Sequence, residues 1–211
     1  MTEPLLILAD TILTGFDADG APLLLEQAGL LIRDGRVADA GTATALRRRH
    51  PGAREAGGKG RAIIPGLINA HHHVGVTPFQ MGARDQPLEL WFTERFRMRD
   101  VPPDLDTLYS AFEMVASGVT TVQHLHSRAP GDVTAVLDRA NCIIGAYDRL
   151  GMRVSYSFAM RDQNRVLYDD DQVFLDLLPA AMRPVAARYL EGFGLTLDDQ
   201  AQVFHELRRQ H

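Results

Sequence analysis

The sequence predicts a mixed α/β protein built from two parts. Residues 5–60 hold short β-type runs separated by Gly- and Asp-containing turns, which is typical of a small β domain. From residue 61 onward, apolar or β-branched runs alternate with stretches of helical spacing, which indicates parallel strands joined by helices. We therefore expect an α/β fold with one domain at residues 1–60 and a second at 61–211.

The first part is predicted from its turn residues. Asp17 to Gly20 forms a turn, and Asp34-Gly35 is a hairpin signal between two strands. The glycine-rich run at 57–60 is expected to be a linker. The expected elements are strands at 5–9, 11–14, 28–33 and 36–40, and a helix at 44–49.

The second part is predicted to read strand, helix, strand, helix, strand. Strands are expected at 63–73, 119–126 and 152–160, and helices at 102–117, 132–151, 172–190 and from 196 to the end. Pro179 and Pro184 interrupt the third helix. Helical spacing predicts the buried faces Leu105, Leu108, Phe112 and Val115; Val133, Val136, Leu137, Ala140, Ile144 and Tyr147; and Leu197, Ala201, Phe204 and Leu207.

Three consecutive histidines end the first of these strands, at His71, His72 and His73. Side chains alternate between the two faces of a strand, so His71 and His73 point one way and His72 the other. Two imidazoles on one face can bind one metal ion. Taken alone, the pattern also fits polar residues at a strand end or an adventitious metal-binding tract.

The residues around these histidines make the pattern more specific. The phrase Pro65 to His73, Pro-Gly-Leu-Ile-Asn-Ala-His-x-His, resembles the first metal-binding strand of the amidohydrolase superfamily. It is most similar to the branch of cytosine and guanine deaminases and triazine chlorohydrolases. Gly118 to Val122 resembles the second strand of the same family.

The resemblance implies a fold and a metal site. The fold is a partial TIM-type (β/α)8 barrel, of which this chain supplies the first three strands, preceded by a small β-sandwich portion. His71 and His73 are then ligands of one divalent metal, Zn with Fe as the alternative. A shifted frame, with a pair based on His72, is the alternative ligand assignment.

Three further side chains are candidates for contact with substrate. Gln80 and Arg84 lie in the long segment that follows the first strand, and active sites of barrels lie at the carboxyl ends of the strands. His124 lies at the carboxyl end of the second strand, where it either contacts substrate or has a supporting or structural role.

The rest of the family's site has no matching positions in this chain. The resemblance places the other metal ligands on strands five, six and eight, and the proton-shuttling carboxylate beyond strand four. The catalytic acid or base is therefore expected beyond the chain end. We expect the 211 residues to be an N-terminal half that does not turn over substrate alone.

The function implied is metal-dependent hydrolysis of a non-peptide C–N bond. The expected reaction is deamination of an amino-substituted purine, pterin, pyrimidine or triazine by a metal-bound hydroxide. The alternatives are hydrolysis of a cyclic amide such as an imidazolone, and a catalytically incomplete fragment. The expected partners are a small heterocyclic substrate and either further copies of the chain or a complementing C-terminal half.

Composition excludes several other classes. A formal net charge of −5 argues against binding to a nucleic-acid backbone. The single cysteine, Cys142, can neither form an internal disulfide nor build a Cys-x-x-Cys zinc site. The apolar runs are too short for a membrane span, and the N-terminus lacks a signal-type charged region, so a cytoplasmic protein is expected.

Overall fold

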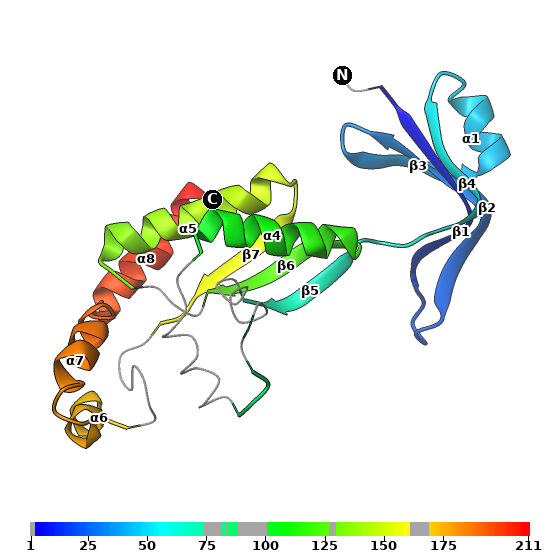
Figure 1. The fold of residues 1–211 in the computed structure, drawn as a ribbon. Coiled ribbons are helices and arrows are strands. Elements are labelled where there is room, and N and C mark those ends of the chain that lie inside the picture. Colours follow the sequence, from blue (N-terminus) through cyan, green and yellow to red (C-terminus); the bar gives the residue numbers. More distant parts are fainter. Residues whose placement is uncertain (1–2, 74–81, 83, 88–100, 127–129, 161–168) are drawn as a thin grey trace. The chain divides into compact units, whose positions relative to one another are not determined.

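The computed structural model describes residues 3–73, 82, 84–87, 101–126, 130–160 and 169–211 (Figure 1). The chain divides into two compact units, Met1–Gly66 and Leu67–His211. Both units contain strands and helices, which confirms the mixed α/β class.

The first unit is built on one four-stranded sheet in the order β3-β2-β1-β4 (Figure 1). β1 pairs antiparallel with β2 and parallel with β4, while β2 and β3 form an antiparallel pair. The elements are β1 (Leu5–Phe16), β2 (Pro22–Arg33), β3 (Arg36–Thr42), α1 (Ala43–Arg49) and β4 (Arg54–Ile63). No second sheet is found among the described residues of this unit, so the sandwich portion stays a prediction.

Both predicted turns are confirmed. Asp34 and Gly35 take φ values of 50° and 73°, the left-handed pair that a two-residue hairpin turn requires. In the turn between β1 and β2, Oδ1 of Asp17 accepts hydrogen bonds from the backbone N–H groups of Asp19 and Ala21. Local side-chain chemistry therefore determines where these strands reverse.

The glycine-rich run at 57–60 is not a linker, because it lies inside β4. The β1–β4 register shifts between Ala9 and Thr11, which are paired with Gly58 and Ala62. The extra residues bulge out, and the backbone N–H of Gly60 donates to Oδ2 of Asp10 at 2.7 Å. Positive φ angles at three of these positions explain the glycines that looked like a linker in the sequence.

α1 packs on the sheet through one leucine and is joined to the edge of the sheet at its carboxyl end. Leu46 is completely buried against Leu6, Leu8 and Leu31. At its carboxyl end, Arg49 donates two hydrogen bonds to the carboxylate of Asp39 in β3, and Nε2 of His50 lies 2.9 Å from the same carboxylate. This ionic contact joins the end of the helix to the edge of the sheet.

An Asp39→Asn variant is expected to weaken the acid sensitivity of the first unit. The hydrogen bond with His50, and then those with Arg49, hold the pKa of Asp39 below its ordinary value of 3.8. A lowered carboxyl pKa contributes stability above the unfolded-state value and loses it as the pH falls through the folded-state value. Urea unfolding from pH 6 down to about 3 should show a shallower loss of stability in the variant than in wild type. Parallel curves would contradict a role for this contact.

The second unit contains a parallel three-stranded sheet in the order β5-β6-β7. Its elements are β5 (Leu67–His72), α4 (Pro103–Ala116), β6 (Val119–His126), α5 (Val133–Arg149), β7 (Arg153–Phe158), α6 (Asp171–Leu177), α7 (Arg183–Glu191) and α8 (Leu197–Gln210). Strand order follows chain order, with α4 and α5 as the crossovers, so the predicted βαβ organisation is confirmed.

α4 and α5 cover one face of this sheet (Figure 1). Met114 of α4 and Tyr147 of α5 pack with Val122 of β6 in one buried cluster. The apolar stripe predicted for α5 is confirmed, since Val136, Ala140 and Tyr147 are buried. The stripe predicted for α4 is wrong: Leu105, Phe112 and Val115 are exposed, while Asp106, Thr107 and Ser110 are buried.

The last helix packs on α5 through a face that overlaps the predicted one only in part, since Leu207 was predicted to be buried and is. Val203 and Leu207 are buried against Val136 and Ala140, whereas the predicted face residues Leu197 and Phe204 are about half exposed. The face was predicted only in part because Val203 and Leu207, four residues apart, contact α5, and the sequence does not show where α5 lies. The helix begins with a capping box between Thr196 and Asp199, two residues whose spacing is visible in the sequence.

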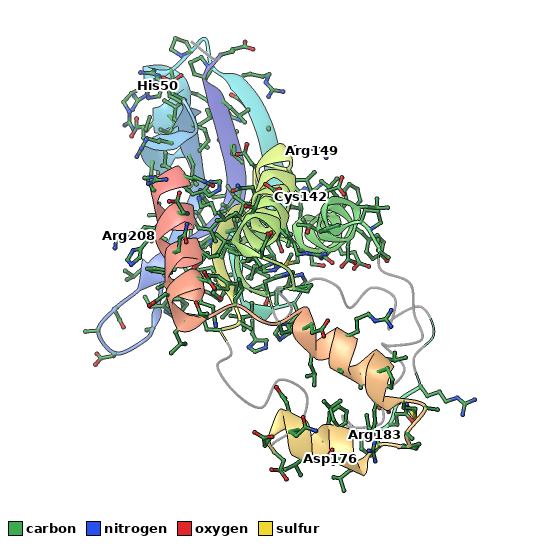
Figure 2. All side chains as sticks on the ribbon, turned by 90° about the vertical axis from the view of Figure 1, so that its left-hand side faces the viewer. His50, Cys142, Arg149, Asp176, Arg183 and Arg208 are labelled. Carbon is green, nitrogen blue, oxygen red and sulfur yellow. The ribbon has the colours of Figure 1, made fainter. Side chains whose placement is uncertain are left out.

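The interrupted third helix is in fact two helices, α6 and α7. Figure 2 shows Arg183 beside Asp176 at the turn that joins them. The Arg183 guanidinium donates hydrogen bonds to the backbone carbonyls of Asp176 and Leu178. These bonds satisfy carbonyl groups at the end of α6, which is how a side chain stabilises a helix end. Within the described part of the chain, no helix is both long and apolar enough to cross a bilayer.

Candidate metal centre

β5 brings His71 and His73 to the same side of the chain. Their rings meet edge to face with centroids 4.8 Å apart, and their Nε2 atoms are 3.0 Å apart. The alternation of a strand produces this arrangement, and the backbone N–H of His71 donates to Oδ1 of Asn69 just before it. Two imidazole nitrogens therefore converge on one point.

The ring of His73 is held in a defined orientation. Its Nδ1–H donates to the backbone carbonyl of Leu125 in β6 at 2.7 Å. A neutral imidazole carries a single N–H, so Nε2 keeps its lone pair. Metal-binding histidines commonly donate their other ring nitrogen in this way, which determines both tautomer and ring orientation. His73 thus has the tautomer that a metal ligand needs.

The spacing of the two Nε2 atoms fits one shared metal ion. With metal–nitrogen distances of about 2.0–2.1 Å, a separation of 3.0 Å corresponds to an N–metal–N angle of about 90–100°. Among the described residues, no group of three or more His, Cys, Asp or Glu side chains is arranged to hold a metal. The pair therefore fits part of a metal site, and any further ligands come from outside the described residues.

A second cluster of histidines faces the helices. His72 lies on the opposite side from its two neighbours, and its ring is 6.2 Å from that of His124. His124 and His126 alternate on β6, and both rings stack with the ring of Tyr156. We call the five residues His72, His124, His126, Tyr147 and Tyr156 the helix-side cluster. Because His72 points to the opposite side of the chain, a pair of metal ligands that includes His72 fits the structure poorly.

Burial favours the uncharged forms of His72, His124 and Tyr147 in the helix-side cluster, through its effect on their pKa values. It lowers the pKa of His124 to about 3, with the charges of His126, His72 and His73 acting in the same direction. Burial also lowers the pKa of His72, although the carboxylate of Asp106 opposes it. The pKa of Tyr147 is raised, again mainly by burial. Neutral imidazoles and phenols are the forms that a desolvated site favours.

The residues predicted to contact substrate lie in three different situations. His124 is completely buried, with Nδ1 2.9 Å from the hydroxyl of Tyr147, which favours a supporting role over direct contact. Arg84 is exposed, but much of the segment around it lies outside the described residues. Gln80 also lies outside them. Contact of Gln80 and Arg84 with substrate therefore stays a prediction.

Two elements of this site were missed by sequence reasoning. The Leu125 carbonyl is a backbone group, which no residue pattern reveals. Tyr147 was assigned only to an apolar stripe, although its hydroxyl contacts His124. The available signal was the alternation of His124 and His126, which places both on one face of β6.

Several known proteins are similar to this chain. Residues 28–53 match a family model described as the imidazolonepropionase-like composite domain of bacteria. A 5'-deoxyadenosine deaminase from Methanothermobacter thermautotrophicus is 27% identical over 192 residues, which is 86% of this chain and 42% of that protein. These similarities support the resemblance to the amidohydrolase superfamily.

Two solved structures have a fold similar to that of this chain. An atrazine chlorohydrolase from Arthrobacter aurescens TC1, complexed with zinc, superimposes with a TM-score of 0.55 at 25% identity, over 73% of this chain and 35% of that one. Guanine deaminase from E. coli gives a TM-score of 0.56 at 16% identity, over 83% of this chain and 41% of that one. Both superpositions show that the chain shares its fold with part of these enzymes. The chain spans less than half the length of the curated relatives it matches.

Proposed function

We propose that this chain is part of an amidohydrolase and supplies the first two ligands of a metal centre that hydrolyses an amino-substituted N-heterocycle. The observation that carries the proposal is the convergence of the His71 and His73 Nε2 atoms at 3.0 Å, with Nδ1 of His73 committed to a backbone carbonyl. The named activities of the relatives, a 5'-deoxyadenosine deaminase among them, support deamination as the reaction.

In this proposal the parallel sheet β5-β6-β7 corresponds to the first three strands of a (β/α)8 barrel. The superposition on barrel enzymes at TM-scores near 0.55 supports that correspondence. The four-stranded sheet of the first unit is then part of the accompanying β-sandwich. The remaining strands, metal ligands and catalytic carboxylate would come from residues beyond those described or from a complementing chain.

Each side chain then has a defined task. Zn is the preferred ion, with Fe as the alternative, and such an ion, when bound, lowers the pKa of a water molecule toward neutrality. His71 and His73 hold the ion at the end of β5. The Leu125 carbonyl keeps the proton of His73 on Nδ1, away from the ligand nitrogen. Gln80 and Arg84 are proposed to contact the heterocycle from the segment that follows.

A second candidate function is hydrolysis of a cyclic amide such as an imidazolone. The match of residues 28–53 to the imidazolonepropionase-like model favours it. Both reactions would use the same pair of histidine ligands and one metal ion, and they differ in their products. Deamination releases ammonia and leaves the ring intact, whereas cyclic-amide hydrolysis opens the ring without releasing ammonia.

A substrate panel distinguishes the two reactions. We expect the full-length protein to release ammonia from one or more members of a panel of amino-substituted purines, 5'-modified adenosines, pterins, pyrimidines and triazines. A His205→Ala variant, which removes an exposed imidazole from α8, should retain the wild-type rate. Ring opening of imidazolones without ammonia would assign the second function. If the metal-loaded protein acts neither on the amino-substituted heterocycles nor on the imidazolones, both proposed functions are contradicted.

A further inference from the structure

We propose that the buried contact between Tyr147 and His124 helps to position the two histidine ligands, His71 and His73. It acts through the Leu125 carbonyl, which accepts a hydrogen bond from His73. The inference rests on the proposed function, since it concerns the same metal centre. It assigns a role to a tyrosine of α5 and a histidine of β6 that do not themselves reach the metal ligands.

The first step is the dependence of His73 on one backbone atom. Among the described residues, the ring of His73 contacts His71 and is oriented by its hydrogen bond to the Leu125 carbonyl. If that carbonyl shifts, Nδ1 loses its acceptor and the ring can rotate or change tautomer. The position of Leu125 therefore determines whether the two Nε2 atoms stay 3.0 Å apart.

The second step is the way in which Leu125 is held. The residues on either side of it, His124 and His126, insert their side chains into the helix layer and are 0% and 6% exposed. Their carbonyls are held from β7, because the Ser157 hydroxyl donates to the carbonyl of His124 and the Ala159 N–H donates to that of His126. Leu125 is therefore the middle of a segment secured at both ends.

The third step is the role of Tyr147 in that anchoring. Its ring is completely buried in α5, and its hydroxyl is 2.9 Å from Nδ1 of His124. When this hydroxyl donates to Nδ1, the single proton of neutral His124 lies on Nε2, which faces Nδ1 of His126 at 3.5 Å. The contacts thus run from α5 through His124 to His126, on both sides of Leu125.

The helix-side cluster also supplies a matched control. Tyr156 stacks on His124 with ring centroids 5.1 Å apart, and its ring is buried in the same cluster. Its buried hydroxyl has no hydrogen-bond partner in the part of the chain that the structure describes. Replacing either tyrosine by phenylalanine removes one buried oxygen atom, but only the change at Tyr147 removes a hydrogen bond to His124.

The experiment compares Tyr147→Phe and Tyr156→Phe in the full-length protein. Zn²⁺ affinity is measured by competition with a chelating dye, and the geometry of the site by the visible absorption of bound Co²⁺. We expect Tyr147→Phe to bind Zn²⁺ about tenfold more weakly than wild type and to have an altered Co²⁺ spectrum. A tenfold loss is at the lower end of what is usual when a residue that supports a metal ligand is replaced. Tyr156→Phe should match wild type in both readouts.

Several results would overturn the positioning role. One is a Tyr147→Phe variant with the wild-type Zn²⁺ affinity and Co²⁺ spectrum. Another is an equal loss of Zn²⁺ affinity in Tyr147→Phe and Tyr156→Phe, which would indicate an effect of packing in general. If Tyr147→Phe fails to fold, His124→Asn and His124→Leu replace it. Asn keeps a polar atom near the Nδ1 position and Leu does not, so equal Zn²⁺ affinity in these two would also overturn the role.

The same measurements separate this inference from the proposed function. A His71→Ala/His73→Ala variant that binds Zn²⁺ as tightly as wild type would contradict the metal centre itself. Loss of Zn²⁺ in that variant, combined with unchanged binding in Tyr147→Phe, would leave the metal centre in place and contradict only the positioning role.

Discussion

Replacing His71 and His73 together by alanine in the full-length protein is expected to remove the bound metal ion and to abolish turnover. The two Nε2 atoms are 3.0 Å apart, so both lone pairs are directed at one ion, and alanine supplies no replacement donor. Elemental analysis should fall from about one Zn or Fe per wild-type chain to nearly none. Activity on the best substrate should fall on the order of 10³-fold or more, because the ion is what makes water acidic enough to react near neutral pH.

The control for this variant is His205→Ala, which removes an exposed imidazole from α8. It should keep both the metal and the activity, and all three proteins should have similar far-UV circular dichroism. Full metal content in a folded His71→Ala/His73→Ala protein would contradict the assignment of these ligands. Single variants add detail: His73→Ala also removes the contact with Leu125, so it should be at least as damaging as His71→Ala.

Gly57→Ala is expected to give the largest loss of stability in the first unit. Gly57 has φ of +82°, and a Cβ added there would lie 2.3 Å from the backbone carbonyl oxygen of Leu8. The positive φ costs an alanine about 1–2 kcal/mol, and the overlap forces β1 and β4 apart. We expect a total loss of about 3 kcal/mol or more in the free energy of unfolding, measured by urea denaturation.

Gly20→Ala separates the two contributions. Gly20 has nearly the same φ, +81°, but an added Cβ would meet no atom within 4 Å. This variant should lose about 1–2 kcal/mol, the cost of the backbone conformation alone. Equal losses in the two variants would show that β4 can shift away from β1 and that the close approach at the bulge carries no stability.

The sequence alone determined the features that depend on neighbouring residues. The alternation of His71, His72 and His73 follows from the two-residue period of a strand, so the residue order is enough to predict the ligand pair. The Asp34-Gly35 hairpin, the turn at Asp17 and the Thr196–Asp199 capping box are equally local. The order of strands and helices in the second unit followed from the same kind of pattern.

The tertiary structure alone decided which faces and which distant groups meet. It turned Asp106 inward and left Phe112 exposed on α4, against the apolar periodicity of that helix. It brought the Leu125 carbonyl to His73 and the Tyr147 hydroxyl to His124, across 52 and 23 positions of the chain. A backbone carbonyl leaves no trace in a residue pattern, and the partner of a buried hydroxyl depends on how helix and sheet pack. The candidate metal ligands could therefore be predicted from the sequence, but the groups that hold them in position could not.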